Sequence, residues 1–213
     1  PRRLGLRAGE IYRGLARLPE RPSRRALRAA LPPADRARAE TVFGTHAAPR
    51  GGYDLRGVAL FGIGECLRSE RFAEALGGGD LDAVARMMRA SHDGDRVVRH
   101  DPAGRARRFA FRTDAAAMEA LAAADADPAG VPGRYACSTE AVDALVDLAA
   151  GAEGVIGAQL AGAGLGGCMM ILVRAPAVGA LLRRLRRGFY RPRGLAFDVH
   201  VCRPVGGAGL LRP

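Results

Sequence analysis

The stretch Gly157-Ala-Gln-Leu-Ala-Gly162-Ala-Gly164-Leu-Gly166-Gly167-Cys168 contains five glycines and joins two short apolar runs. These runs, residues 154–160 and 168–173, are typical of buried strands. A glycine-rich loop between strands can turn successive backbone N–H groups toward an anion, because no side chain holds a ligand away. No lysine follows the glycines, so the loop is not a Walker phosphate loop. The stretch predicts a strand–loop–strand unit that either approaches a phosphate or lets two elements cross closely.

Helical patterns dominate the rest of the chain. In a helix that follows Ser138, an apolar stripe is expected to face the core, and Asp143 and Asp147 to face away from it. Near the end, residues 197–201 alternate apolar and polar side chains and predict a half-buried strand. The order of elements predicts an α+β fold in which helices cover an antiparallel sheet. The remaining expected helices span residues 55–76, 81–91, 114–127 and 178–190.

The net charge of +11 comes entirely from arginine, because the chain contains no lysine. It also contains no asparagine and no tryptophan, and aromatic residues make up only 5%. Such a charge would favour nucleic acid as a partner, but the skewed composition indicates a bias spread over the whole surface. Because no aromatic residues interleave with the arginines, a nucleic-acid binder remains a minor alternative.

The cysteines and histidines show no metal-binding or redox spacing. No two of the four cysteines form a C-x-x-C pair, so we expect buried free thiols in a reducing, cytoplasmic compartment. The four histidines lack H-E-x-x-H spacing, and no metal ligand is predicted among them. Residues 155–173 carry no charge, but their glycines favour a turn over a membrane span, so no membrane partner is expected.

The first 52 residues differ in character from the remainder. They are rich in arginine, and the pair Gly51-Gly52 closes them. Within residues 1–31 we expect two short exposed helices rather than a transit peptide, because prolines interrupt the pattern. The chain is therefore predicted to have an Arg-rich helical N-terminal segment over residues 1–52 and a main domain over residues 53–213.

Several motifs together resemble those of the GHMP sugar kinases, in the form found in galactokinases. The glycine-rich stretch resembles the third signature motif of that family, G-[AS]-R-M-T-G-[AG]-G-F-G-G-C. The other matches occur in family order, and together they cover the chain from about residue 53 onward. They are Tyr53-Asp-Leu-Arg56 at a helix start, Gly79-Asp80-Leu followed by Met87-Met88-Arg-Ala-Ser91-His92, and Tyr135-Ala-Cys-Ser138-Thr-Glu140-Ala-Val-Asp143-Ala-Leu145. Residues 198–210, with their glycine-rich end, resemble the last strand of the family.

The resemblance implies a GHMP kinase C-terminal domain with a ferredoxin-like core. It also implies phosphorylation of the anomeric hydroxyl of galactose or a related sugar, with ATP and Mg²⁺ as cofactors. Tyr53 would bind the sugar through its hydroxyl, and Gly162, Gly164, Gly166 and Gly167 would form a loop near the nucleotide phosphates. The chain departs from the family motif at Gln159, Leu160, Ala161 and Leu165, where galactokinases have Arg, Met, Thr and Phe.

Other parts of the family pattern have no counterpart in these 213 residues. They are the sugar-binding segment, the serine-rich nucleotide loop and the segment with the catalytic aspartate. The resemblance therefore implies the C-terminal half of a larger kinase, or a degenerate gene product, with no catalytic residue of its own. We expect the isolated chain to be inactive. A non-catalytic sugar- or nucleotide-binding module and the Arg-rich nucleic-acid binder are the alternatives.

Overall fold

The computed structural model describes residues 5–162 and 167–203. Within these ranges the chain forms eight α-helices and two antiparallel sheets of two strands each, which confirms the predicted α+β class. The helices are α1 (Ala8–Ala16), α2 (Arg24–Ala30), α3 (Pro33–Gly44), α4 (Leu55–Gly77), α5 (Leu81–Asp95), α6 (Ala115–Ala123), α7 (Glu140–Ala150) and α8 (Val178–Leu185). The strands are β1 (Val98–His100), β2 (Ala106–Arg108), β3 (Val155–Leu160) and β4 (Met169–Val173).

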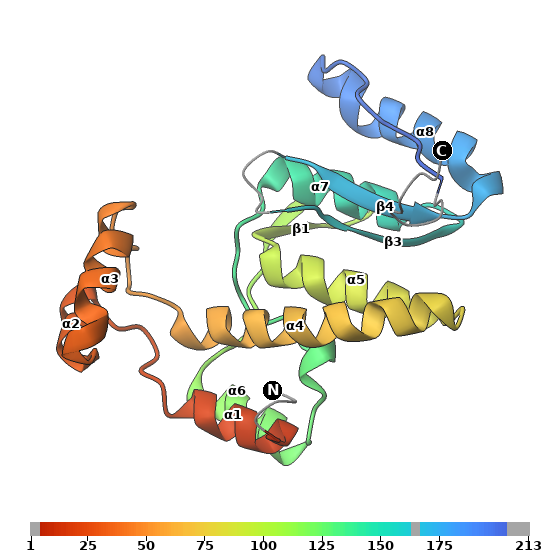
Figure 1. Ribbon diagram of the computed structural model, residues 1–213. Helices are drawn as coiled ribbons and strands as arrows, with labels where there is room; N and C mark the ends of the chain where they lie inside the picture. Colours follow the sequence, from red (N-terminus) through yellow and green to blue (C-terminus); the bar gives the residue numbers. More distant parts are fainter. Residues whose placement is uncertain (1–4, 163–166, 204–213) are drawn as a thin grey trace, which may run out of the picture.

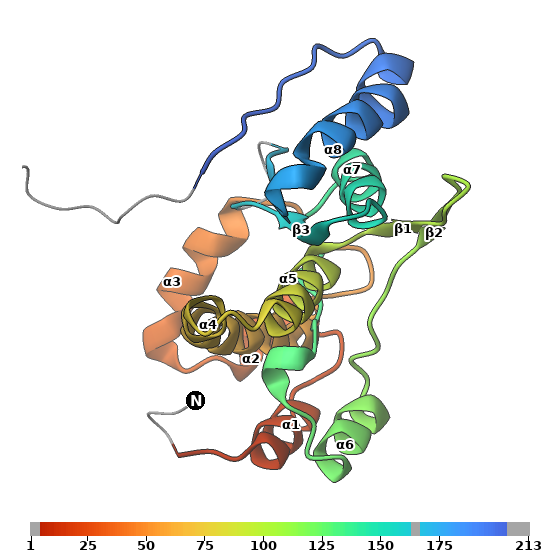
Figure 2. The same ribbon diagram turned by 90° about the vertical axis from the view of Figure 1, so that its right-hand side faces the viewer.

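The elements stack in layers (Figure 1). Helices α1 and α6 lie below α4, while α5 lies next to α4 and under the sheet of β3 and β4. Helices α7 and α8 lie on the other side of that sheet, and the turned view in Figure 2 shows the same order. The pair α2 and α3 stands to one side of the stack, near the start of α4.

Each of the four helices from α4 to α7 begins with a side chain that caps it. Asp54, Asp80 and Asp114 each accept a hydrogen bond from the backbone N–H three residues later, at the starts of α4, α5 and α6. Thr139 caps α7 in the same way. Such caps satisfy N–H groups that have no partner within the helix, so these helices begin within a residue or two of their predicted starts.

The N-terminal segment does not behave as one unit. Helix α2 buries no residue, as expected, but α1 buries Ile11, Tyr12 and Leu15. These side chains share an apolar cluster with Leu60 of α4 and Met118 of α6. The expectation of two exposed helices is therefore wrong for α1, because α6, which is distant in sequence, covers its apolar stripe. The domain boundary after residue 52 stays a prediction.

The glycine-rich stretch forms the predicted strand–loop–strand unit. Strands β3 and β4 are antiparallel, with Leu160 opposite Met169. The N–H of Ala161 donates to the carbonyl of Cys168 at 3.0 Å and closes the base of the loop. Alternate residues of β3, Ala158 and Leu160, are buried in a cluster with α7 and α8. The sheet thus holds the loop at one end of the packed layers.

The predicted strand over residues 197–201 is wrong, since the described part of this segment pairs with no other strand. Helix α8 continues as a π-helix, Arg186–Tyr190, and the following chain folds back onto it. The ring of Phe197 packs edge-on against that of Tyr190 at 5.1 Å, and the Tyr190 hydroxyl donates to the Asp198 carbonyl at 3.2 Å. Alternation alone does not make a strand, because the segment must also pair with a neighbouring strand.

The cysteines are free, as expected, but they are not buried. Cys66, Cys168 and Cys202 are exposed and Cys137 is partly buried, so the expectation that these thiols are buried is wrong. None of the helices in the described residues is long and apolar enough to span a membrane. The uncharged residues 155–173 that raised that question belong to β3, β4 and the loop between them.

Candidate functional site

The described ends of the glycine-rich loop have an open backbone. Gly162 and Gly167 adopt φ angles of +76° and +70°, a region that side chains rarely allow. A Cβ atom added at either position would meet no atom within 4 Å, so the space on that side of the backbone is open. Gly164 and Gly166 lie outside the described residues, and their role stays a prediction.

Tyr53 lies at the start of α4 and contacts the α2–α3 pair. Its hydroxyl accepts a hydrogen bond from Nε of Arg24 at 2.9 Å and lies 2.9 Å from Nε2 of His46. Its ring is tilted against that of Phe43 at 5.9 Å. Among the described residues, no hydrogen bond or ion pair links Tyr53 to the glycine-rich loop. Its predicted sugar-binding role stays a prediction.

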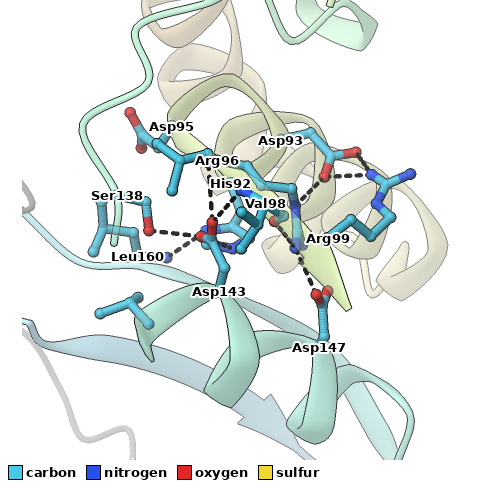
Figure 3. A network of polar contacts seen from close by, with 12 residues as sticks. His92, Asp93, Asp95, Arg96, Val98, Arg99, Ser138, Asp143, Asp147 and Leu160 are labelled. Carbon is cyan, nitrogen blue, oxygen red and sulfur yellow. Dashed lines mark hydrogen bonds and ion pairs between the residues drawn. The ribbon is translucent and has the colours of Figure 1, made fainter. Parts of the chain in front are cut away.

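A histidine that the sequence analysis assigned no role holds the end of β3 (Figure 3). The backbone N–H of Leu160 donates to Nδ1 of His92, on α5, at 3.3 Å. His92 is only 1% exposed, and its Nε2 lies 3.4 Å from Oδ1 of Asp143. Because Nδ1 accepts a hydrogen bond from Leu160, Nδ1 carries no proton, and the ring presents Nε2 to Asp143. The residue that enters the loop is thus anchored to α5 and α7.

Asp143 is completely buried and collects hydrogen bonds from several elements. Its Oδ1 accepts from the Ser138 hydroxyl at 2.7 Å, and its Oδ2 accepts from the N–H groups of Val97 and Val98, each at 2.9 Å. Burial alone would raise the pKa of Asp143, but the hydrogen bonds from His92, Val98, Ser138 and Val97 outweigh burial and hold the pKa below its ordinary value. Asp143 therefore carries a negative charge that the fold stabilises.

Asp147 lies one turn further along α7 and extends the network. Its Oδ2 accepts from Nη1 of Arg96 at 2.8 Å and from the N–H of His100 at 2.7 Å. The prediction that Asp143 and Asp147 face away from the core is wrong. The apolar stripe of α7 does face β3, but β1 and the C-terminal end of α5 cover the flank of the helix that carries the two carboxylates.

The thiol nearest this network is hydrogen-bonded to a carboxylate. Sγ of Cys137 donates to Oδ1 of Asp95 at 3.1 Å. Burial and the adjacent carboxylate raise the pKa of Cys137 to about 12. Burial also raises the pKa of Asp95, although the hydrogen bond from Cys137 opposes that shift. Thiolate chemistry is therefore disfavoured at this position.

The structure brings three of the sequence motifs into contact. The Ser-His pair of α5, the Ser138–Asp143 segment and the strand that enters the glycine-rich loop meet at His92. The sequence signal for this contact was present, since His92 and Asp143 both occupy matched motif positions next to apolar stripes. The sequence did not show which side of each helix β1 and β3 would cover.

Comparison with known proteins gives one family. Residues 106–191 match the family model described as the C-terminal domain of GHMP kinases. The chain is 26% identical over 155 residues to a galactokinase from Roseiflexus sp. strain RS-1, which covers 73% of this chain and 30% of that protein. It is 35% identical over 157 residues to a galactokinase from Chloroflexus aurantiacus, covering 74% of this chain and 30% of that protein. The match thus spans under a third of either relative, and no solved structure matches the chain.

Proposed function

Because residues 106–191 are a GHMP kinase C-terminal domain, we propose that this chain supplies the C-terminal part of an ATP-dependent sugar kinase. The substrate is galactose or a related sugar, and the phosphorylated group is its anomeric hydroxyl. The contact between His92 and Leu160 carries the proposal, because it joins three motifs that resemble galactokinases at the entry of one loop. The names of the two relatives support the choice of sugar.

The role we assign to this chain is to present the glycine-rich loop to the nucleotide phosphates. The positive φ angles and the open space at Gly162 and Gly167 allow a phosphate to approach the backbone, where N–H groups can donate to it. ATP would supply the phosphoryl group. In the described ranges, no group of three or more His, Cys, Asp or Glu side chains could hold a metal ion. These residues do not fit a complete Mg²⁺ site.

The 213 residues alone are proposed to have no kinase turnover. Phosphoryl transfer depends on positioning the reactants and neutralising charge around the nucleotide. The sequence contains no counterpart of the family's sugar-binding, serine-rich or catalytic aspartate segments. The described residues thus offer a scaffold and a loop, but no group placed to activate a sugar hydroxyl.

Two assays test the proposal. The protein of which this chain is part should phosphorylate galactose, or a close relative of it, at the anomeric position and consume one ATP per product formed. Gly162→Val in that protein should abolish most turnover, because valine cannot adopt the φ angle of +76° without strain. Gly62→Val, on the exposed side of α4, is the matched control. A full protein that phosphorylates no sugar would contradict the function, and ATP consumption by the 213 residues would contradict their inactivity.

A non-catalytic sugar- or nucleotide-binding module is the second candidate. Ala161 favours it, because this position carries a threonine in the galactokinase motif and alanine has no hydroxyl to offer a ligand. The backbone of Ala161 still closes the loop through Cys168. This candidate predicts nucleotide or sugar binding by the full protein without any turnover, and the assay above distinguishes the two.

A further inference from the structure

A cavity of about 470 Å³ lies between α5, α7 and the first residues of β3. Ligand pockets for small molecules commonly occupy about 300–1,000 Å³, so the cavity has room for a molecule larger than a single ion. Its wall includes three arginines, Arg89, Arg96 and Arg99, and two aspartates, Asp93 and Asp147. The cavity lies beside β3, between the helices that flank it, rather than at the glycine-rich loop.

The two aspartates of the cavity are already engaged by arginines. Asp93 accepts from Nε of Arg96 at 2.9 Å, and both of its oxygens accept from Nη2 of Arg99 at 2.7 Å. Asp147 accepts from Nη1 of Arg96 at 2.8 Å. Figure 3 shows these side chains gathered at the ends of α5 and β1. The aspartates therefore orient Arg96 and Arg99 without saturating them.

Hydrogen-bond donors remain in excess around the cavity. Arg89 makes no hydrogen bond or ion pair with any described residue, so its whole guanidinium group is available. Arg99 uses only Nη2 on Asp93, and Arg96 leaves its Nη2 without an acceptor. With three arginines against two aspartates, the wall also carries an excess positive charge. A ligand that complements this wall must be an anion rich in acceptor oxygens.

We propose that this cavity binds a small phosphorylated molecule, with Arg89 and Arg99 as its main contacts. Guanidinium groups recognise phosphate by paired N–H donors, and here Asp93 holds the Arg99 group in advance. The phosphate would lie between α5 and α7, and the remainder of the molecule would fill the cavity along β3. This site is distinct from the loop that we assign to the nucleotide.

The site has a structural route to the glycine-rich loop. His92 lines the same cavity, and its ring accepts the N–H of Leu160 at the entry of that loop. A ligand in the cavity would contact the helix whose side chain fixes the end of β3. Ligand binding in the cavity can therefore be coupled to ligand binding at the loop without direct contact between the two sites.

Calorimetric titration of the 213-residue chain at low ionic strength tests the proposal. The probes are glucose 6-phosphate, inorganic phosphate and citrate. We expect one phosphate-dependent site, with glucose 6-phosphate bound more tightly than citrate. Arg89→Gln and Arg99→Gln should each weaken glucose 6-phosphate binding about tenfold, because each removes charged hydrogen bonds. Arg86→Gln is the matched control, since Arg86 is an exposed residue on α5 that does not line the cavity.

Four results would overturn the proposal. The first is that neither phosphate probe binds, and the second is that citrate binds as tightly as glucose 6-phosphate. The third is that Arg86→Gln and Arg89→Gln weaken glucose 6-phosphate binding equally. The fourth is that Gly162→Val abolishes this binding while Arg89→Gln leaves it intact. Equal weakening would indicate diffuse attraction by the basic surface, and the last result would place the ligand at the loop. The assay uses neither nucleotide nor turnover, so its failure would leave the proposed kinase function standing.

Discussion

Two regions of this molecule bury charged side chains, and they use the charge in opposite ways. On α7, the buried carboxylate of Asp143 collects contacts from α5, β1 and the segment before α7. In α4, the buried guanidinium groups of Arg56 and Arg68 donate to backbone carbonyls of distant segments. The carboxylate links the motifs next to the loop, whereas the arginines donate hydrogen bonds to carbonyls at or near the ends of short helices.

The difference separates residues that serve the site from residues that serve the fold. Arg56 satisfies Ala16 and Leu18 at the end of α1, and Arg68 satisfies Ala129 and Val131 around a short 3₁₀ helix. Such carbonyls have no partner within their own helix. Both kinds of buried charge should stabilise the protein, but only the loss of Asp143 should reach Leu160 and the loop.

The largest effect is expected for Asp143→Ala. The substitution leaves the N–H groups of Val97 and Val98 and the Ser138 hydroxyl without their acceptor and removes the contact with His92, at a cost of about 4 kcal/mol. Urea unfolding measures the free energy, and amide hydrogen exchange at Leu160 should accelerate beyond the change in global stability. Glu119→Ala on the exposed face of α6 is the control. Exchange at Leu160 that tracks only global unfolding would contradict the proposed anchor.

Arg68→Met should cost slightly less, about 3 kcal/mol, because it leaves the carbonyls of Ala129 and Val131 unpaired. The methionine keeps most of the apolar contact made by the arginine stem. Urea unfolding again gives the free energy, and Arg71→Met, whose ion pair with Asp127 is exposed, is the matched control. Once global stability is subtracted, the exchange of Leu160 should match that of the wild type. Selective opening at Leu160 in this variant would erase the distinction between the two regions.

The pH dependence of stability should come from the carboxylate region. The pKa of Asp143 is lowered by folding, so its contribution is present above the unfolded value of about 3.9 and is lost as the pH falls through the folded pKa. The pKa of Asp95 is raised, so protonating Asp95 favours the fold and opposes that loss. Asp143→Asn should therefore flatten the fall in stability below about pH 4, whereas Asp95→Asn should steepen it. Thermal melting from pH 2 to 7 measures both slopes, and an unchanged acid slope in Asp143→Asn would contradict the assignment.

A pair of glycine substitutions compares the loop with the helix. Gly162→Ala should cost about 1–2 kcal/mol, because φ at this position is +76°. Gly62→Ala lies within α4, where a new methyl group meets nothing within 4 Å, and should stabilise the protein by about 0.8 kcal/mol. Opposite signs in urea unfolding are the expected outcome. A neutral Gly162→Ala would show that the loop relaxes to another backbone conformation.

A similarly small effect is expected at Tyr12, in the cluster of α1, α4 and α6. Its hydroxyl is buried and has no hydrogen-bond partner among the described residues. Tyr12→Phe should stabilise the protein by about 1 kcal/mol, since it removes an unsatisfied polar group and keeps the ring. Thermal melting suffices as the measurement, with Tyr135→Phe, an exposed tyrosine stacked on Phe61, as the control. Destabilisation in Tyr12→Phe would reveal a partner for the hydroxyl.

Local pattern predicted the elements better than it predicted their neighbours. The span of α4, the burial of Met87 and Met88, and the pair β3 and β4 all follow from apolar periodicity and are confirmed. Two of the failures depend on segments that are distant in sequence: helix α6 covers α1, and β1 covers the flank of α7 that carries Asp143. The last predicted strand fails for another reason, since its residues pair with no strand and fold back onto the end of α8.

The candidate site could likewise be predicted only in part from the sequence. The glycine positions and the motif order could be derived from the sequence, because backbone freedom and spacing are local properties. The role of His92 could not, because it depends on which ring nitrogen meets Leu160 after α5 docks on β3. For Tyr53 the sequence motif predicted a role in sugar binding. Its described side-chain contacts are to Arg24, His46 and Phe43, so that role stays a prediction.

The hydrogen bond from Leu160 to His92 also implies an order of assembly. The two residues are 68 positions apart, whereas β3 and β4 are joined by a short loop and can pair early. Contacts between residues that are distant in sequence form late, because closing a long stretch of chain costs more entropy. The hairpin can therefore exist before its entry is fixed. The end of β3 is therefore expected to be fixed only when α5 has docked, after the hairpin has paired.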